Sequence, residues 1–177
     1  MSNRSSAGMT LIELLIGFVL IGVLLALGVP SFSAWMQNLQ VRNAAESIFN
    51  GLQLARANAV QRNKSVTFTM AGPDSSWAVT VDTPNLITGE VAAVQSRSAA
   101  EGTPNATIAT SNAAISFSGL GATNLAGLAT IQVTNPTGGA CAAASGPMRC
   151  LNITVAVGGQ IKMCDPKITA AGDSRKC

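Results

Sequence analysis

Histidine is absent from this 177-residue chain, and charged residues make up only 11% of it. Without histidine the chain has neither a Ser/His nor a Cys/His catalytic pair. An S-x-x-K motif is missing as well, and Asp165 and Asp173 are better explained as turn and loop residues than as a catalytic carboxylate pair. The sequence therefore predicts a protein that is not an enzyme and that needs no cofactor or metal.

Cysteine is missing from the first 140 residues, and all four cysteines lie near the end of the chain, at Cys141, Cys150, Cys164 and Cys177. An even number in a loop-rich region favours two disulfides and an oxidising compartment. A zinc site fits poorly, because no C-x-x-C pair and no histidine accompany these cysteines. Three pairings are possible. We favour Cys141–Cys150 with Cys164–Cys177, since each closes a loop that is polar or contains glycine and proline.

The few charges are distributed unevenly. Residues 31–64 and 141–177 each have a net charge of +3, whereas residues 71–140 have a net charge of −3. The total of +3 is too small to indicate a nucleic-acid partner by itself. Residues 31–64 and 141–177 are thus basic, and the segment between them is acidic.

One long apolar run, Met9–Val29, follows a short polar leader, residues 1–8, whose single charge is Arg4. As a helix, this run would span about 31 Å, close to the roughly 30 Å hydrocarbon thickness of a bilayer. A secretory signal peptide would have a shorter apolar core, with its cleavage site after that core. The run therefore predicts a membrane-spanning helix, with the leader and Arg4 on the cytoplasmic side.

Glu13 interrupts the apolar run close to its beginning. A carboxylate in such a position costs on the order of 2.5–3.5 kcal/mol at a helix centre and less near an end. Cleavage after Gly8 would give Met9 a free α-amino group with a pKa of roughly 8. We therefore expect Glu13 of one subunit to pair with the N-terminus of a neighbour and to set the register between packed helices.

The segment Gly8-Met9-Thr10-Leu11-Ile12-Glu13-Leu14 resembles the signal of type IV prepilins and type II secretion pseudopilins. The resemblance implies that a prepilin peptidase cuts after Gly8 and methylates Met9, where the family usually has phenylalanine. It also implies that Glu13 acts in assembly, and that Pro30 lies where type IV pilins commonly have a helix-kinking proline. The implied partners are the peptidase, the inner membrane and other pilin subunits.

Beyond Pro30 the pattern changes to that of an amphipathic helix, residues 31–64. The apolar face is predicted to contain Trp35, Leu39, Ala45, Ile48, Phe49, Leu52, Ala55 and Ala59. The expected organisation is a leader at 1–8, a membrane helix at 9–30, this amphipathic helix at 31–64 and a globular domain at 65–177. Pro30 is expected to kink or locally melt the long helix.

From Ser65 onward the apolar residues alternate, as in strands. The expected strands are 66–70, 77–81, 114–118, 129–134, 150–157 and 160–164, the last two joined by Gly158-Gly159. They predict an α+β fold in which a mostly antiparallel sheet packs on the amphipathic helix. Residues 84–113 are polar and interrupted by proline, so we expect a variable loop there.

Two further segments resemble the GspH/FimT branch of pilin-like proteins. One is Leu54–Asn63 with the strand that follows; the other is the C-terminal pattern Arg149-Cys150-Leu151, Gly158-Gly159, Met163-Cys164-Asp165-Pro166 and Cys177. The resemblance implies a structural subunit with a periplasmic domain, either a minor type IV pilin in a pilus tip or priming complex or a type II secretion pseudopilin. The cysteine pattern favours the pilus.

A third alternative is DNA capture, known for some FimT-type pilins, through the basic residues Arg149, Lys162, Lys167, Arg175 and Lys176. These cations have no interleaved aromatic residues for stacking on single strands. A Gly-Arg-x-Arg tail is also missing, and Gly172-Asp173-Ser174-Arg175 is the nearest run. We therefore favour a solvated basic edge as the interpretation of this group.

Overall fold

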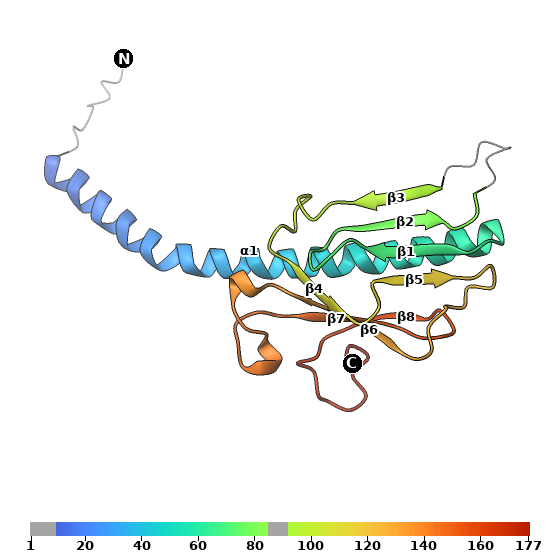
Figure 1. Ribbon diagram of the computed structural model, residues 1–177. Helices are drawn as coiled ribbons and strands as arrows, with labels where there is room; N and C mark the ends of the chain where they lie inside the picture. The colour runs from blue at the N-terminus through green and yellow to red at the C-terminus, as the bar shows by residue number, and fades with distance from the viewer. Residues whose placement is uncertain (1–9, 85–91) are drawn as a thin grey trace, which may run out of the picture.

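A single long helix organises the molecule. The computed structural model describes residues 10–84 and 92–177, so the predicted cleavage site at Gly8 and Met9 lies outside the described residues. The helix α1 (Leu11–Arg62) begins at Thr10, whose side chain accepts a hydrogen bond from the backbone N–H of Glu13. It ends at Asn63, which adopts the left-handed conformation and donates its N–H to the carbonyls of Ala59 and Val60. Its C-terminal half lies on the domain and its N-terminal half projects beyond it (Figure 1).

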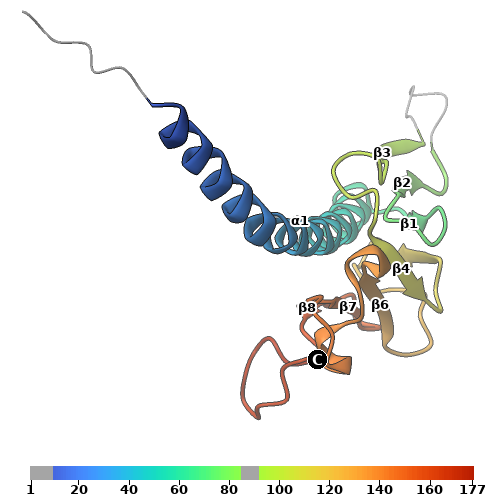
Figure 2. The same cartoon turned by 90° about the vertical axis from the view of Figure 1, so that its left-hand side faces the viewer.

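The helix is not interrupted at Pro30, because the backbone is helical throughout α1. Of the two effects expected from Pro30, a kink or local melting of the helix, local melting is therefore wrong. The axis instead bends between the projecting half and the half that lies on the domain (Figure 2).

In its described residues, the domain has two four-stranded sheets rather than one. The first has the order β3 (Ala93–Arg97), β2 (Trp77–Val81), β1 (Val66–Met70), β5 (Ala114–Phe117). The second has the order β4 (Thr107–Thr110), β6 (Ala129–Thr134), β7 (Leu151–Val155), β8 (Ile161–Cys164). All pairings between these strands are antiparallel. The prediction of an α+β, mostly antiparallel domain on the helix is confirmed.

The core lies between α1 and the inner faces of both sheets. Ile48, Leu52 and Ala55 from the predicted helix face are fully buried. Trp35, predicted on the same face, is 56% exposed because it precedes the part of the helix that the domain covers. The buried face instead begins at Val41.

The prediction that residues 84–113 form a loop is wrong, because this region contains both β3 and β4. The strand β3 is an edge strand whose residues are mostly exposed, so it has no apolar alternation to reveal it. The strand β4 has only four residues, and a hydrogen bond to a distant segment helps to hold it. The N–H of Ile108 donates to the carbonyl of Pro73 over 2.6 Å. Both strands therefore depend on partners that are distant in sequence.

Two short 3-10 helices, η2 (Pro136–Gly138) and η3 (Ala142–Ala144), lie between β6 and β7. Of the two, η2 lies against α1, at the point where the helix leaves the domain (Figure 1).

Candidate functional site

The N-terminal half of α1 exposes a continuous apolar surface. Among the side chains that the structure describes, the sixteen exposed large hydrophobic ones of the helix before Val60 all lie between Leu11 and Met36. By length and composition α1 is able to cross a membrane, and its most apolar window is not buried by the domain. We call residues 11–36 the exposed half of α1. Such a surface is stable only when lipid or other protein covers it.

Glu13 lies in the first turn of α1 and is exposed. Thr10 and Glu13 have the spacing of a capping box, and the hydrogen bond from Glu13 N to Thr10 Oγ1 measures 3.3 Å. The positive end of the helix dipole favours a carboxylate at this position. The fold thus tolerates Glu13, and its side chain remains available to a partner.

Gly17, Gly22 and Gly28 also belong to the exposed half of α1. A Cβ atom at any of the three would meet nothing within 4 Å. The fold of the chain itself therefore does not require these glycines, whereas packed membrane helices approach each other more closely at such positions.

Hydrogen bonds between side-chain amides connect α1 to the domain at the point where the exposed half ends. Gln37 Oε1 accepts hydrogen bonds from Nδ2 of Asn135 at 2.7 Å and from Nδ2 of Asn105 at 3.2 Å. Gln40 Oε1 accepts from the backbone N–H of Asn105 at 3.0 Å. Asn135 is fully buried, and its Oδ1 also accepts from the N–H of Gly138. We call this network the amide junction.

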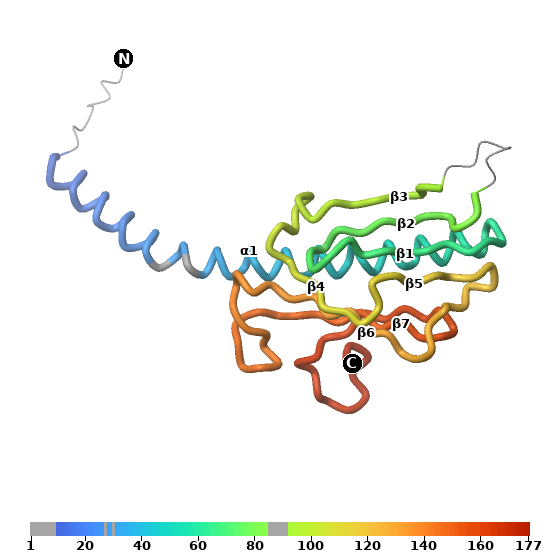
Figure 3. Tube along the Cα trace, viewed as in Figure 1, coloured from blue at the N-terminus to red at the C-terminus, as the bar shows by residue number. Residues whose placement is uncertain are grey.

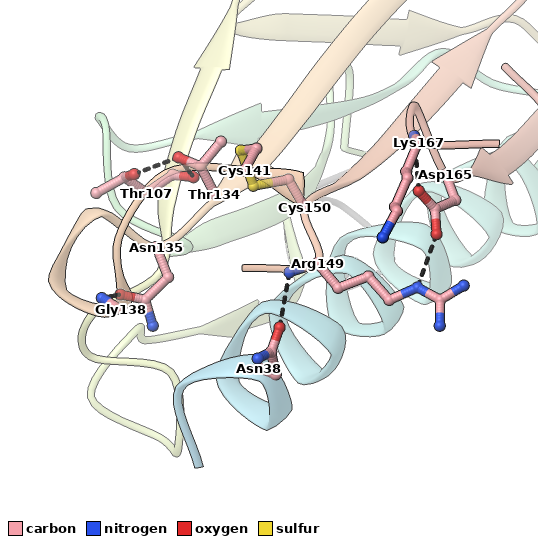
Figure 4. The surroundings of a disulfide bond; sticks show 10 residues. All are labelled: Asn38, Thr107, Thr134, Asn135, Gly138, Cys141, Arg149, Cys150, Asp165 and Lys167. Carbon is pink, nitrogen blue, oxygen red and sulfur yellow. Dashed lines mark hydrogen bonds and ion pairs between the residues drawn. A yellow bond between two sulfur atoms is a disulfide. The ribbon is translucent and has the colours of Figure 1, made fainter. Parts of the chain in front are cut away.

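A second contact at the same level involves the loop that precedes β7. Asn38 Oδ1 accepts a 2.7 Å hydrogen bond from the backbone N–H of Arg149 (Figure 4). The disulfide Cys141–Cys150 closes this loop, and Cys150 is buried. The disulfide therefore holds the loop in the position from which it contacts the helix.

The second disulfide, Cys164–Cys177, closes the C-terminal loop. Both disulfides follow the pairing favoured from the sequence. Asp165, which is buried, joins the two loops: its Oδ2 accepts from Nε of Arg149 and its Oδ1 accepts from the N–H of Lys167 (Figure 4).

The basic residues considered for DNA binding are partly neutralised within the chain. Arg149 pairs with Asp165, and Arg175 pairs with Asp173 at 2.8 Å. The hydrogen bond from Arg175 lowers the pKa of Asp173 from 3.8 to about 2. Lys162 donates to the carbonyl of Lys176. This arrangement favours a solvated basic edge over a track of cations that follows phosphates.

Sequence reasoning missed the amide junction. The available signal was Gln37 and Gln40, two side-chain amides within one turn in the first part of the amphipathic pattern. Their partners, Asn105 and Asn135, lie in connections without apolar periodicity, so the sequence did not indicate which residues they would meet.

Comparisons with known proteins agree with this geometry. Residues 44–165 match the family model described as type II transport protein GspH, and residues 3–29 match the prokaryotic N-terminal methylation motif. No curated protein sequence matches the chain significantly.

Two solved structures share the fold. The type IV minor pilin FimU of Pseudomonas aeruginosa PAO1 is 16% identical, with a TM-score of 0.53 over 73% of this chain and 91% of FimU. The minor pseudopilin EpsH from the type 2 secretion system of Vibrio cholerae is 10% identical, with a TM-score of 0.53 over 73% of this chain and 99% of EpsH.

Proposed function

This chain belongs to the GspH family of pilin-type structural subunits, and from that premise we propose that it is a minor type IV pilin of a pilus tip or priming complex. The proposal depends most on the exposed half of α1. A surface of this length is too apolar for water, and the domain does not cover it. In the membrane, lipid covers it; in a filament, helices of neighbouring subunits replace the lipid.

We further propose that a prepilin peptidase cuts after Gly8 and methylates Met9. The support is the match to the N-terminal methylation motif, together with a helix that begins only two residues after Met9. The new amine would then be a cation that can pair with Glu13 of another subunit.

The domain is proposed to face the periplasm, with α1 anchored in the inner membrane. An oxidising compartment is required for Cys141–Cys150 and Cys164–Cys177 to persist. Arg4 in the leader agrees with a cytoplasmic N-terminus. In spheroplasts of the source cells, added protease should cleave the domain and leave the N-terminal half of α1 protected.

The proposed function is tested in source cells with an active peptidase. Mass spectrometry of the membrane-bound chain should find a methylated Met9 as the first residue. The variant Glu13→Gln should be processed normally yet be depleted from sheared filaments, because it keeps the capping-box geometry and loses only the charge. Glu101→Gln, at an exposed position in the domain, is the matched control and should assemble normally. Retention of residues 1–8 or normal assembly of Glu13→Gln would contradict the proposal.

A type II secretion pseudopilin is the second candidate, favoured by the description of the matching family as type II transport protein GspH and by the fold shared with EpsH. Deletion of the gene distinguishes the two. Loss of surface pili with normal export supports the minor pilin, and loss of protein export with normal piliation supports the pseudopilin.

A further inference from the structure

A groove of about 650 Å³ lies between the C-terminal part of α1 and the hairpin of β7 and β8. Its lining consists of Gln53, Arg56, Ala57, Val60 and Gln61 from the helix with Gln160 and Ile161 from the hairpin. The end of α1, the loop after β5 and the turn between β7 and β8 come together at the end of the domain farthest from the exposed half of α1 (Figures 1 and 3).

The side chain of Arg56 lies against two glycine turns beside the groove. A Cβ atom at Gly121 or at Gly159 would lie 3.2 Å from Nε of Arg56. Both glycines have positive φ, and a Cβ at Gly159 would also collide with the carbonyl oxygen of Gly121. Both turns thus require glycine, and the guanidinium of Arg56 lies beside their backbone.

Arg56 is exposed and, within the described part of the chain, makes no hydrogen bond or ion pair. No Asp or Glu of the described residues lines the groove. Glu46, the next acidic residue back along α1, pairs with Arg42 at 2.8 Å. A guanidinium has five N–H donors and binds a carboxylate bidentately, so the counter-charge that fits here is a carboxylate from outside the chain.

Aliphatic side chains continue the surface beyond Arg56. Val60 and Val157 are about half exposed, and Leu120, next to Gly121, is 91% exposed. The loop and the turn are joined, because the N–H of Thr123 donates to the carbonyl of Val157 over 2.8 Å. An arginine beside exposed aliphatic groups suits a protein interface, where arginine is enriched.

We propose that this surface, the Arg56 groove, binds a segment of a neighbouring pilin subunit that carries a carboxylate beside apolar side chains. The inference rests on the proposed function, since a neighbouring pilin subunit is present only if the chain assembles with others. Nucleic acid fits less well, because one guanidinium among carboxamides and aliphatic groups neutralises few phosphates.

The test places the photoreactive amino acid p-benzoylphenylalanine at Gln160 of the full chain in source cells. Mass spectrometry should map the crosslink to an Asp- or Glu-containing peptide of another pilin subunit. Arg56→Glu should reduce the yield of this product about tenfold, equivalent to about 1.4 kcal/mol. Arg62→Glu changes the charge equally at a position outside the groove and should leave the yield within about twofold. Changing the crosslinked acidic residue of the partner to lysine should restore the yield with Arg56→Glu.

A second crosslinker position, Leu20 in the exposed half of α1, separates this inference from the proposed function. If Leu20 crosslinks to pilin subunits but Gln160 does not, the groove proposal is overturned and the proposed function stands. The same holds if Arg56→Glu has no effect, or if the product at Gln160 is nucleic acid or a protein other than a pilin. If neither position crosslinks to a pilin and sheared filaments lack the chain, both proposals fail.

Discussion

Asp165 accepts a 2.8 Å hydrogen bond from Nε of Arg149, and this ion pair joins the two loops that the disulfides close. Arg149 directly precedes Cys150, and Asp165 directly follows Cys164. The Asp165 side chain is only 5% exposed, whereas that of Arg149 is 62% exposed. The backbone N–H of Arg149 also bonds to Asn38 of α1. One carboxylate therefore connects the C-terminal loop, through the loop before β7, to the helix.

Asp165→Asn should lower the free energy of unfolding by about 1–3 kcal/mol, because a buried carboxylate loses its charge-assisted hydrogen bonds. Urea unfolding of the full chain in detergent, followed by the fluorescence of buried Trp77, measures this loss. Asp173→Asn is the matched control, since it removes a carboxylate from a more exposed pair, and its effect should be clearly smaller. Equal effects of the two variants would contradict this role of Asp165.

Asn135→Ala should destabilise the domain by about 1–3 kcal/mol, because it leaves the N–H of Gly138 and one acceptor site of Gln37 without their partner. Hydrogen exchange at the amide of Asn105, which donates to Gln40, should become faster as the amide junction loosens. Asn50→Ala, at an exposed helix position, should change stability by less than about 0.5 kcal/mol. Unchanged exchange at Asn105 would show that the amide junction does not act as one network.

Gly51→Ala should destabilise the chain by about 1–2 kcal/mol, although alanine is the better helix former by about 1 kcal/mol. A Cβ at Gly51 would lie 2.7 Å from Cε2 of Phe68 and 3.1 Å from the ring of Trp77, and both rings are in the core. Urea unfolding is again the measurement. Gly28→Ala is the control in the same helix, where a Cβ meets nothing within 4 Å, and it should not lower the stability of the domain.

The carboxyl group of Asp173 should titrate with a pKa of about 2, because Arg175 donates hydrogen bonds to it from its side chain and its backbone. The pKa is lowered on folding, so this pair contributes stability above pH 3.8 and loses that contribution as the pH falls toward 2. NMR titration of the carboxyl carbon measures the value directly. Arg175→Gln should return the pKa toward 3.8, and Lys176→Gln should leave it near 2.

Local sequence patterns predicted strands in which buried and exposed side chains alternate. The strand β1 alternates buried and less buried residues from Val66 to Met70, and the predicted and observed strands coincide. The strand β3 shows no such alternation, since it lies at an edge and faces mostly solvent. Its position follows from pairing with β2, which is a property of the folded sheet.

The candidate site was likewise predictable from the sequence only in part. The sequence indicated the exposed half of α1 and Glu13, because an apolar run of bilayer length and a carboxylate within it are local features. The amide junction and the Arg56 groove were not predictable, since each combines α1 with connections that lie far along the chain.

The sequence by itself determined the long helix with its apolar half, the change to strands after Ser65 and a disulfide-rich C-terminal end, because period, length and cysteine spacing are encoded locally. Only the tertiary structure decided that the strands divide into two sheets and that amides hold the helix to them. It also decided that Arg56 lies on two glycine turns. Those features depend on hydrogen bonds and contacts between residues far apart in sequence, which only the folded chain brings together.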